Sequence, residues 1–144
     1  ITTGSVRLDG ASTHYAPIEF PAVADHGVVE ALIKGAERAG VRYHLGVTAS
    51  SDTFYPGEER ADSFRKYNLR SLRGATEEWR RLGVLNYEME SATLLTMTAS
   101  MGLAGGCVTG VVNRGSTGRI TKTSLKKGEE AAVKAAVAAL EFMV

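Results

Sequence analysis

Residues 84–101 read VLNYEMESATLLTMTASM, and this stretch decides the fold. The apolar run at 84–87 is typical of a short strand, whereas the residues from Glu88 to about Met101 have the composition of a helix. Polar acceptors therefore stand where a strand gives way to a helix. In open α/β sheets such positions face ligands, because ligands collect outside the carboxyl ends of the strands.

Glu88 and Glu90 flank Met89 at this junction and allow two interpretations. In the first, the two carboxylates accept hydrogen bonds from the 2′ and 3′ hydroxyls of a ribose, while the thioether packs on the apolar face of the sugar. In the second, the glutamates only complement the positive end of a helix, an effect of about 0.3–1 kcal/mol. The residue types alone leave both interpretations open.

The rest of the chain alternates between strand-like and helix-like segments. We expect strands at 5–9, 41–49, 84–87 and 105–112, and helices at 22–39, 75–82, 88–101 and 125–142. Asp25 and Gly40 mark the two ends of the first helix, and an alanine stripe gives the last helix a packing face. This alternation predicts a layered α/β domain, and no repeat or linker divides residues 1–144 into more than a single domain.

The composition is that of an ordinary globular domain, with 44% hydrophobic and 23% charged residues. A formal net charge of +1 gives no electrostatic reason to expect a nucleic acid or an acidic membrane as a partner. Cys107 is the only cysteine, so we expect a core residue rather than a disulfide, in a cytoplasmic protein. No apolar run is long enough to span a membrane and no signal peptide is recognisable, so neither membrane insertion nor secretion is expected.

Three polar stretches follow predicted strands, at 50–60, 88–91 and 113–119, and we expect them to converge on one pocket. In the first stretch, Phe54 is suited to stack on a flat heterocycle, Arg60 to donate to a ring carbonyl, and Glu58 to accept from a ring N–H. The competing interpretation is an ordinary surface loop with a Pro-Gly turn and an exposed ion pair.

No metal site is expected, because the three histidines are scattered without the spacing of zinc ligands. Ser50, Ser51, Asp52 and His44 supply the residue types of a hydrolytic triad, but no nucleophile elbow surrounds either serine. We expect Asp52 to accept a hydrogen bond that caps its loop.

The motifs SSDTFYPGEER at 50–60, NYEMESATLLTM at 86–97 and GVVNRG at 110–115 resemble, in order and spacing, the uridine phosphorylases of the nucleoside phosphorylase family. SVRLDGAS at 5–12 and APIEFPAVAD at 16–25 extend the resemblance, which covers the C-terminal part of the family's subunit. It implies an incomplete nucleoside phosphorylase fold, three-layer-like, with a twisted mixed sheet wrapped by helices. The implied reaction is the reversible phosphorolysis of uridine to uracil and ribose 1-phosphate, with phosphate as co-substrate and no cofactor.

The resemblance also implies roles for individual residues. Glu88, Met89 and Glu90 would hold the ribose. Arg60 and Arg114 are the implied catalytic residues, because they would stabilise negative charge on the departing uracil. The implied base site consists of Phe54, Glu58, Arg60, Val111, Val112 and Arg114. Purine-cleaving relatives carry an aspartate after the strand that corresponds to 105–112. No aspartate occurs at 112–115 here, which favours a pyrimidine nucleoside.

Glu58 stands where the uridine enzymes usually have glutamine. An amide donates and accepts, whereas an ionised carboxylate only accepts and would repel an anionic leaving group. Either burial raises the pKa of Glu58 so that it donates when protonated, or the base preference and rate differ, for example toward cytosine.

No position matches the family's glycine-rich phosphate loop or its arginines. The phosphate site is expected from a longer chain or a neighbouring subunit, since the family forms homo-oligomers, usually hexamers. Two rival functions also fit this gap: a nucleoside hydrolase of the same fold, and a non-catalytic nucleoside-binding or structural fragment. The glycine-rich segment 115–123 is open to interpretation as a mobile lid or as a solvated connection.

Overall fold

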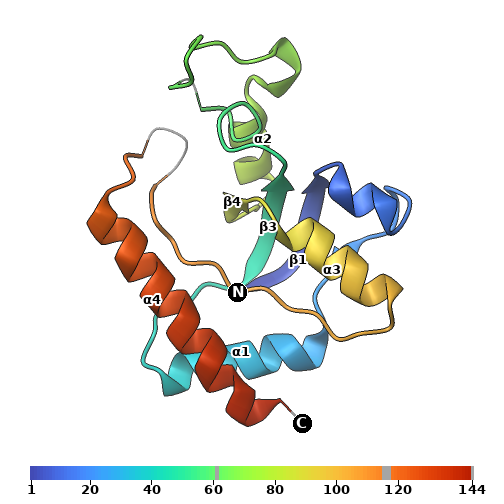
Figure 1. Ribbon diagram of the computed structural model, residues 1–144, viewed down its shortest axis with the longest axis vertical. Coiled ribbons are helices and arrows are strands. Elements are labelled where there is room, and N and C mark those ends of the chain that lie inside the picture. The colour runs from blue at the N-terminus through green and yellow to red at the C-terminus, as the bar shows by residue number, and fades with distance from the viewer. Residues whose placement is uncertain (61, 115–117, 144) are drawn as a thin grey trace.

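Four strands form one mixed sheet with the order β2-β1-β3-β4 (Figure 1). β1 (Thr2–Leu8) pairs in parallel with β3 (Gly46–Ser51), and β3 pairs in parallel with β4 (Asn86–Glu88). β2 (Ala22–Val23) pairs antiparallel with the outer side of β1. The computed structural model describes residues 1–60, 62–114 and 118–143.

Helices flank this sheet, which confirms the predicted α/β fold (Figure 1). The described α-helices are α1 (His26–Arg38), α2 (Ala75–Arg81), α3 (Ser91–Ser100) and α4 (Lys122–Ala139). Short 3-10 helices occupy Ala11–His14, Arg70–Leu72 and Leu140–Phe142. α3 packs on β1 and β2, while α1 packs against α4. No helix in the described ranges is long and apolar enough to cross a membrane.

Helix α1 begins later than its sequence pattern predicts. The expected helix at 22–39 loses its first residues, because Ala22–Val23 pairs with β1 instead. Asp25 then caps the helix, with its carboxylate accepting a hydrogen bond from the Val28 N–H at 3.0 Å. Gly40 follows the other end with a φ of +64°, the left-handed conformation that commonly terminates helices.

The junction at 84–91 also differs from its prediction. β4 continues through Glu88, which pairs with Ser50 of β3, so Glu88 is a strand residue and α3 begins only at Ser91. Strand pairing therefore overrides the helical composition of the first predicted turn. Two other elements also have bounds that differ from the prediction. The strand expected at 41–49 begins at Gly46, and the helix expected at 125–142 spans Lys122–Ala139 and is followed by a 3-10 turn.

The predicted strand at 105–112 is wrong. Within the described residues, one isolated bridge between Cys107 and Thr2 joins this segment to another strand. Its glycines instead allow the backbone to approach two helices closely. A Cβ atom added at Gly106 would lie only 2.3 Å from Val28 of α1, and one added at Gly110 only 2.1 Å from the Gly128 oxygen of α4. An apolar run buried by helix packing cannot be told from a buried strand by periodicity. Cys107, expected in the core, is half-buried, and burial raises the pKa of its thiol.

Helices α1 and α4 meet at Gly35, where their backbones approach without an intervening side chain. A Cβ on Gly35 would lie 2.5 Å from the Ala135 oxygen and 2.6 Å from the Ala139 nitrogen. The packing stripe predicted for this helix consists of Ala132, Ala135, Ala136, Ala139 and Leu140. Ala135 and Ala139 are buried as predicted, whereas Leu140 is 64% exposed. The contact requires small residues on both helices.

We expect Gly35→Ala to destabilise the protein although alanine is the better helix former. The gain in helix propensity is about 1 kcal/mol, whereas overpacking against backbone atoms costs about 1–3 kcal/mol because neither helix can yield locally. Thermal unfolding of the complete natural protein would measure the difference. Lys34→Ala, at an exposed neighbouring position on α1, is the control, and equal melting temperatures for the two variants would contradict the packing argument.

Candidate functional site

The three parallel strands end at the same level of the sheet. Their register aligns Leu8 with Ser51 and Ser50 with Glu88. The segments that leave these strands therefore start side by side, and the neighbouring arrowheads of β1 and β3 are visible in Figure 1. This edge is where ligands bind in sheets of this class.

The loop at 52–60 folds back on the end of β3. The Gly57 N–H donates to Thr53 Oγ1 at 2.9 Å, and the Arg60 N–H donates to the Tyr55 oxygen at 2.7 Å. A Cβ on Gly57 would lie 1.9 Å from Ser51 Oγ, so only glycine fits this turn. The Pro-Gly turn is thus part of a tightly closed loop that returns Arg60 to the strand end.

Arg60 is 7% exposed, so the competing interpretation of an exposed arginine is wrong. Its Nε and Nη2 donate to the Asp62 carboxylate at 3.2 and 3.0 Å, and its guanidinium carbon lies 4.7 Å from the centroid of the Phe54 ring. Its Nη1 is buried and makes no hydrogen bond within the described structure. A buried donor without an acceptor costs about 1–3 kcal/mol, so an acceptor atom of a ligand would be stabilised there.

Glu58 is half-buried, and its carboxyl group has a pKa raised to about 7. Burial is the main cause, the Arg60 guanidinium opposes it, and the carboxylates of Glu88 and Glu90 raise it further. Of the two alternatives for this position, the structure therefore supports the one in which burial raises the pKa. The electrostatic coupling also shows that the first two predicted stretches come together.

Glu88 uses its carboxylate to hold the start of α3. Oε2 accepts hydrogen bonds from the N–H groups of Glu90 and Ser91 at 2.8 and 2.7 Å, and Oε1 accepts from the Ser91 hydroxyl at 2.6 Å. The Ser91 hydroxyl also lies 2.9 Å from Ser5 Oγ on β1. Helix capping is thus observed for Glu88, while Met89 and Glu90 are exposed beside it.

The third predicted stretch is only partly described. Val112 is half-buried, Val111 is 73% exposed and Arg114 is exposed. Asn113 Nδ2 donates to the Gly118 oxygen at 3.3 Å, across residues 115–117, which lie outside the described residues together with that part of the predicted lid. In the part of the chain that the structure describes, no hydrogen bond or ion pair joins Arg114 to the loop at 52–60.

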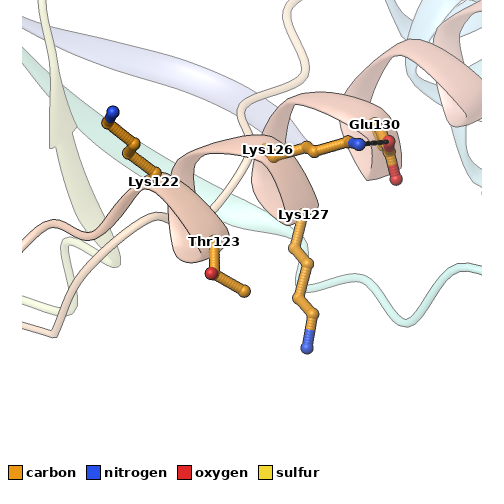
Figure 2. A pocket seen from close by; sticks show the side chains of 5 residues that line it. All are labelled: Lys122, Thr123, Lys126, Lys127 and Glu130. Atoms are coloured by element: carbon orange, nitrogen blue, oxygen red, sulfur yellow. Dashed lines mark ion pairs between the residues drawn. The ribbon is translucent and has the colours of Figure 1, made fainter.

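Two surface hollows lie away from the strand ends. The first is at the start of α4, where Figure 2 shows side chains that point in different directions and an ion pair between Lys126 and Glu130. The second lies between α4, residues 41–44 and residues 108–111, and includes Val111. Neither contains Arg60 or Glu88, so the geometry of the strand ends, rather than the shape of a hollow, defines the candidate site.

Sequence reasoning missed two buried or bridging carboxylates near these strand ends. Asp9 accepts hydrogen bonds at 2.7 Å from the Ser12 N–H, the Ser12 hydroxyl and the Thr93 hydroxyl. Glu59 accepts from the N–H groups of Gly74 and Thr76. Ser12 is a local partner of Asp9, but Thr93 lies 84 residues from Asp9, and the partners of Glu59 lie 15 and 17 residues away. No local pattern signals these distant contacts. Asp52 accepts a hydrogen bond as expected, but the donor is the Gly10 N–H, at 2.8 Å, in the segment that follows β1 rather than in its own loop.

Comparison with known proteins agrees with this geometry. A family model described as "Phosphorylase superfamily" matches residues 1–143. The chain is 56% identical to uridine phosphorylase of Klebsiella aerogenes and 55% identical to that of Escherichia coli, in both cases over 140 residues, 96% of this chain and 55% of the relative. It is 45% identical to uridine phosphorylase of Haemophilus influenzae over 145 residues, 100% of this chain and 58% of the relative.

The chain therefore belongs to the phosphorylase superfamily, as the motifs at 50–60, 86–97 and 110–115 indicated. It spans about half the length of the curated relatives that it matches. Among the described residues, no three His, Cys, Asp or Glu side chains are grouped as a metal ion would require.

We expect Glu58→Gln to stabilise the protein at pH 8 and to have little effect below pH 4.5. The folded-state pKa of about 7 exceeds the ordinary value of 4.5, so the protonated carboxyl favours folding and that contribution is lost as the pH rises from 4.5 through 7. Glutamine cannot ionise and avoids this loss.

Melting temperatures of both proteins between pH 4 and pH 8.5 would measure the effect. Glu78→Gln, an exposed position on α2, is the control. A difference between wild type and Glu58→Gln that does not change across this range would contradict the raised pKa.

Proposed function

We propose that this chain forms the nucleoside-binding part of a uridine phosphorylase, which converts uridine and phosphate reversibly to uracil and ribose 1-phosphate. The observation that carries the proposal is the buried guanidinium of Arg60, whose Nη1 has no partner within the described structure while its face packs on Phe54. A planar donor beside an aromatic ring suits a flat, oxygen-bearing base. The names of the most similar relatives support uridine as the nucleoside.

In this proposal the base side of the site stabilises the leaving group. As the C–N bond stretches, uracil gains negative charge, and Arg60 Nη1 would donate to one of its carbonyl oxygens. Glu58, with a pKa of about 7, is partly protonated near neutral pH and would then donate a hydrogen bond as the glutamine of the uridine enzymes does. Arg114 would act at the far edge of the base, with Val111 and Val112 lining the pocket.

The sugar side of the site would stabilise positive charge. A carboxylate has about four lone-pair positions, and Glu88 uses three of them for Glu90 and Ser91. The remaining position on Oε1 is available to a ribose hydroxyl, so capping and sugar binding are compatible in this residue. Glu90 would accept from the other hydroxyl, and Met89 would pack on the sugar.

Several parts of the proposal concern the complete protein. Phosphate would be bound by residues outside this chain, either in the same polypeptide or in a neighbouring subunit of a homo-oligomer. We propose a cytoplasmic enzyme that needs no cofactor or metal beyond its co-substrate phosphate, with neither nucleic acid nor a membrane as partner.

The test is uracil release from uridine by the complete natural protein, with and without phosphate, followed by cytidine in place of uridine. Release that requires phosphate supports the proposal. Release of uracil with water alone would favour a nucleoside hydrolase, and binding of uridine without release would leave a nucleoside-binding protein. Faster cleavage of cytidine than of uridine would assign the altered base preference to Glu58.

We expect Arg60→Ala to lower kcat/KM for uridine about 10²–10³-fold, the effect of removing a donor from developing negative charge. Arg60→Lys keeps the charge but loses the fork that Asp62 and the base share, so most of the loss should remain. Steady-state kinetics would measure both. Arg80→Ala, which removes an exposed arginine paired with Glu77, is the matched control, and equal effects at the two positions would contradict the assignment.

A further inference from the structure

Glu59 lies between the two residues assigned to the base, Glu58 and Arg60, and its backbone is unusual. Its φ is +56°, a left-handed value that residues with side chains rarely adopt. Strained conformations of this kind persist where the surrounding structure determines them, and they concentrate at functional sites. The backbone at Glu59 turns sharply, with its N–H bonded to the Pro56 oxygen at 3.1 Å.

The side chain of Glu59 shows what holds this conformation. Its Oε1 accepts from the Gly74 N–H at 2.5 Å and its Oε2 from the Thr76 N–H at 3.0 Å, so one carboxylate bridges the first N–H groups of α2. Gly74 has no side chain with which to cap that helix itself. Burial opposes ionisation of Glu59, but these N–H donors outweigh it and hold its pKa below the ordinary value.

A second anchor holds the other end of the same loop. Asp52 accepts from the Gly10 N–H at 2.8 Å, immediately after β3, while Glu59 fixes the loop to α2 immediately before Arg60. Phe54 and Glu58 lie between these two anchors. The loop is thus held at both ends by carboxylates that accept hydrogen bonds from backbone N–H groups of other segments.

We propose that Glu59 is a positioning residue: by bridging the loop at 52–60 to the first turn of α2, it sets the direction in which Glu58 and Arg60 face the base. The inference rests on the proposed function of this site. A misplacement of about 1 Å at a binding group can cost a hundredfold in rate, so a carboxylate that touches no substrate can control base recognition.

The experiment compares Glu59→Gln and Glu59→Gly in the complete natural protein. Glycine tolerates the positive φ and isolates the loss of the carboxylate, whereas glutamine keeps one acceptor and loses the second. We expect kcat/KM for uridine to fall about ten- to a hundredfold in Glu59→Gly and less in Glu59→Gln, with the KM for phosphate unchanged. Glu78→Gln, on the same helix, is the control and should have no effect.

A purely structural cap would give a different result. Equal changes in the KM values of uridine and phosphate, or losses no larger than in the control, would overturn the inference. Uracil affinity measured by calorimetry gives a second readout that needs no turnover, and it should weaken in the same order. If the wild-type protein neither cleaves uridine nor binds uracil, the proposed function fails and this inference falls with it, whereas unaltered uracil affinity in the variants of an active protein overturns the inference alone.

Discussion

The hydrogen bonds that the Glu88 carboxylate accepts from the start of α3 are the interaction on which the other parts of this structure depend. They fix the last residue of β4 to the helix that packs across β1 and β2, and Ser91 extends the connection to Ser5. The Glu88 carboxylate therefore belongs to a residue of the sheet, caps helix α3 and lies in the candidate site. Because a helix start leaves its first N–H groups without partners, an anionic acceptor there stabilises the helix and is itself held in one orientation. A group oriented in this way loses little entropy when it accepts a further hydrogen bond, as the proposed sugar contact would require.

The same carboxylate influences the base side of the site. Burial is the main cause that raises the pKa of Glu58, Arg60 opposes it, and the carboxylates of Glu88 and Glu90 raise it further. Negative charge at the start of α3 therefore favours a neutral acid at Glu58, which in the proposed reaction avoids placing a second anion beside the leaving group. The two halves of the site are thus electrostatically consistent, although Glu58 lies in the loop at 52–60 and Glu88 ends β4.

Prediction from the sequence succeeded where a pattern is local. Asp25 and Gly40 mark the ends of α1 because capping depends on neighbouring residues, and the alternation of segments indicated the α/β class. It failed where distant contacts decide. Ala22–Val23 and Glu88 became strand residues through pairing with β1 and β3, and residues 105–112 packed against helices through glycines. Of the candidate site, the convergence of 58–60 with 88–90 was anticipated, whereas Glu59 was missed because its partners are 15 and 17 residues away.

The half-buried Cys107 has a consequence for chemical reactivity. Thiolates, not thiols, attack alkylating reagents and peroxides, and a raised pKa keeps this sulfur protonated at neutral pH. The Cys107 carbonyl oxygen accepts a hydrogen bond from the Thr2 N–H at 3.0 Å, so the backbone at this residue is attached to the first strand of the sheet. Loss of the contact with β1 would expose this thiol further and lower its pKa toward the ordinary value, so faster alkylation of Cys107 would indicate that this segment has detached from the sheet.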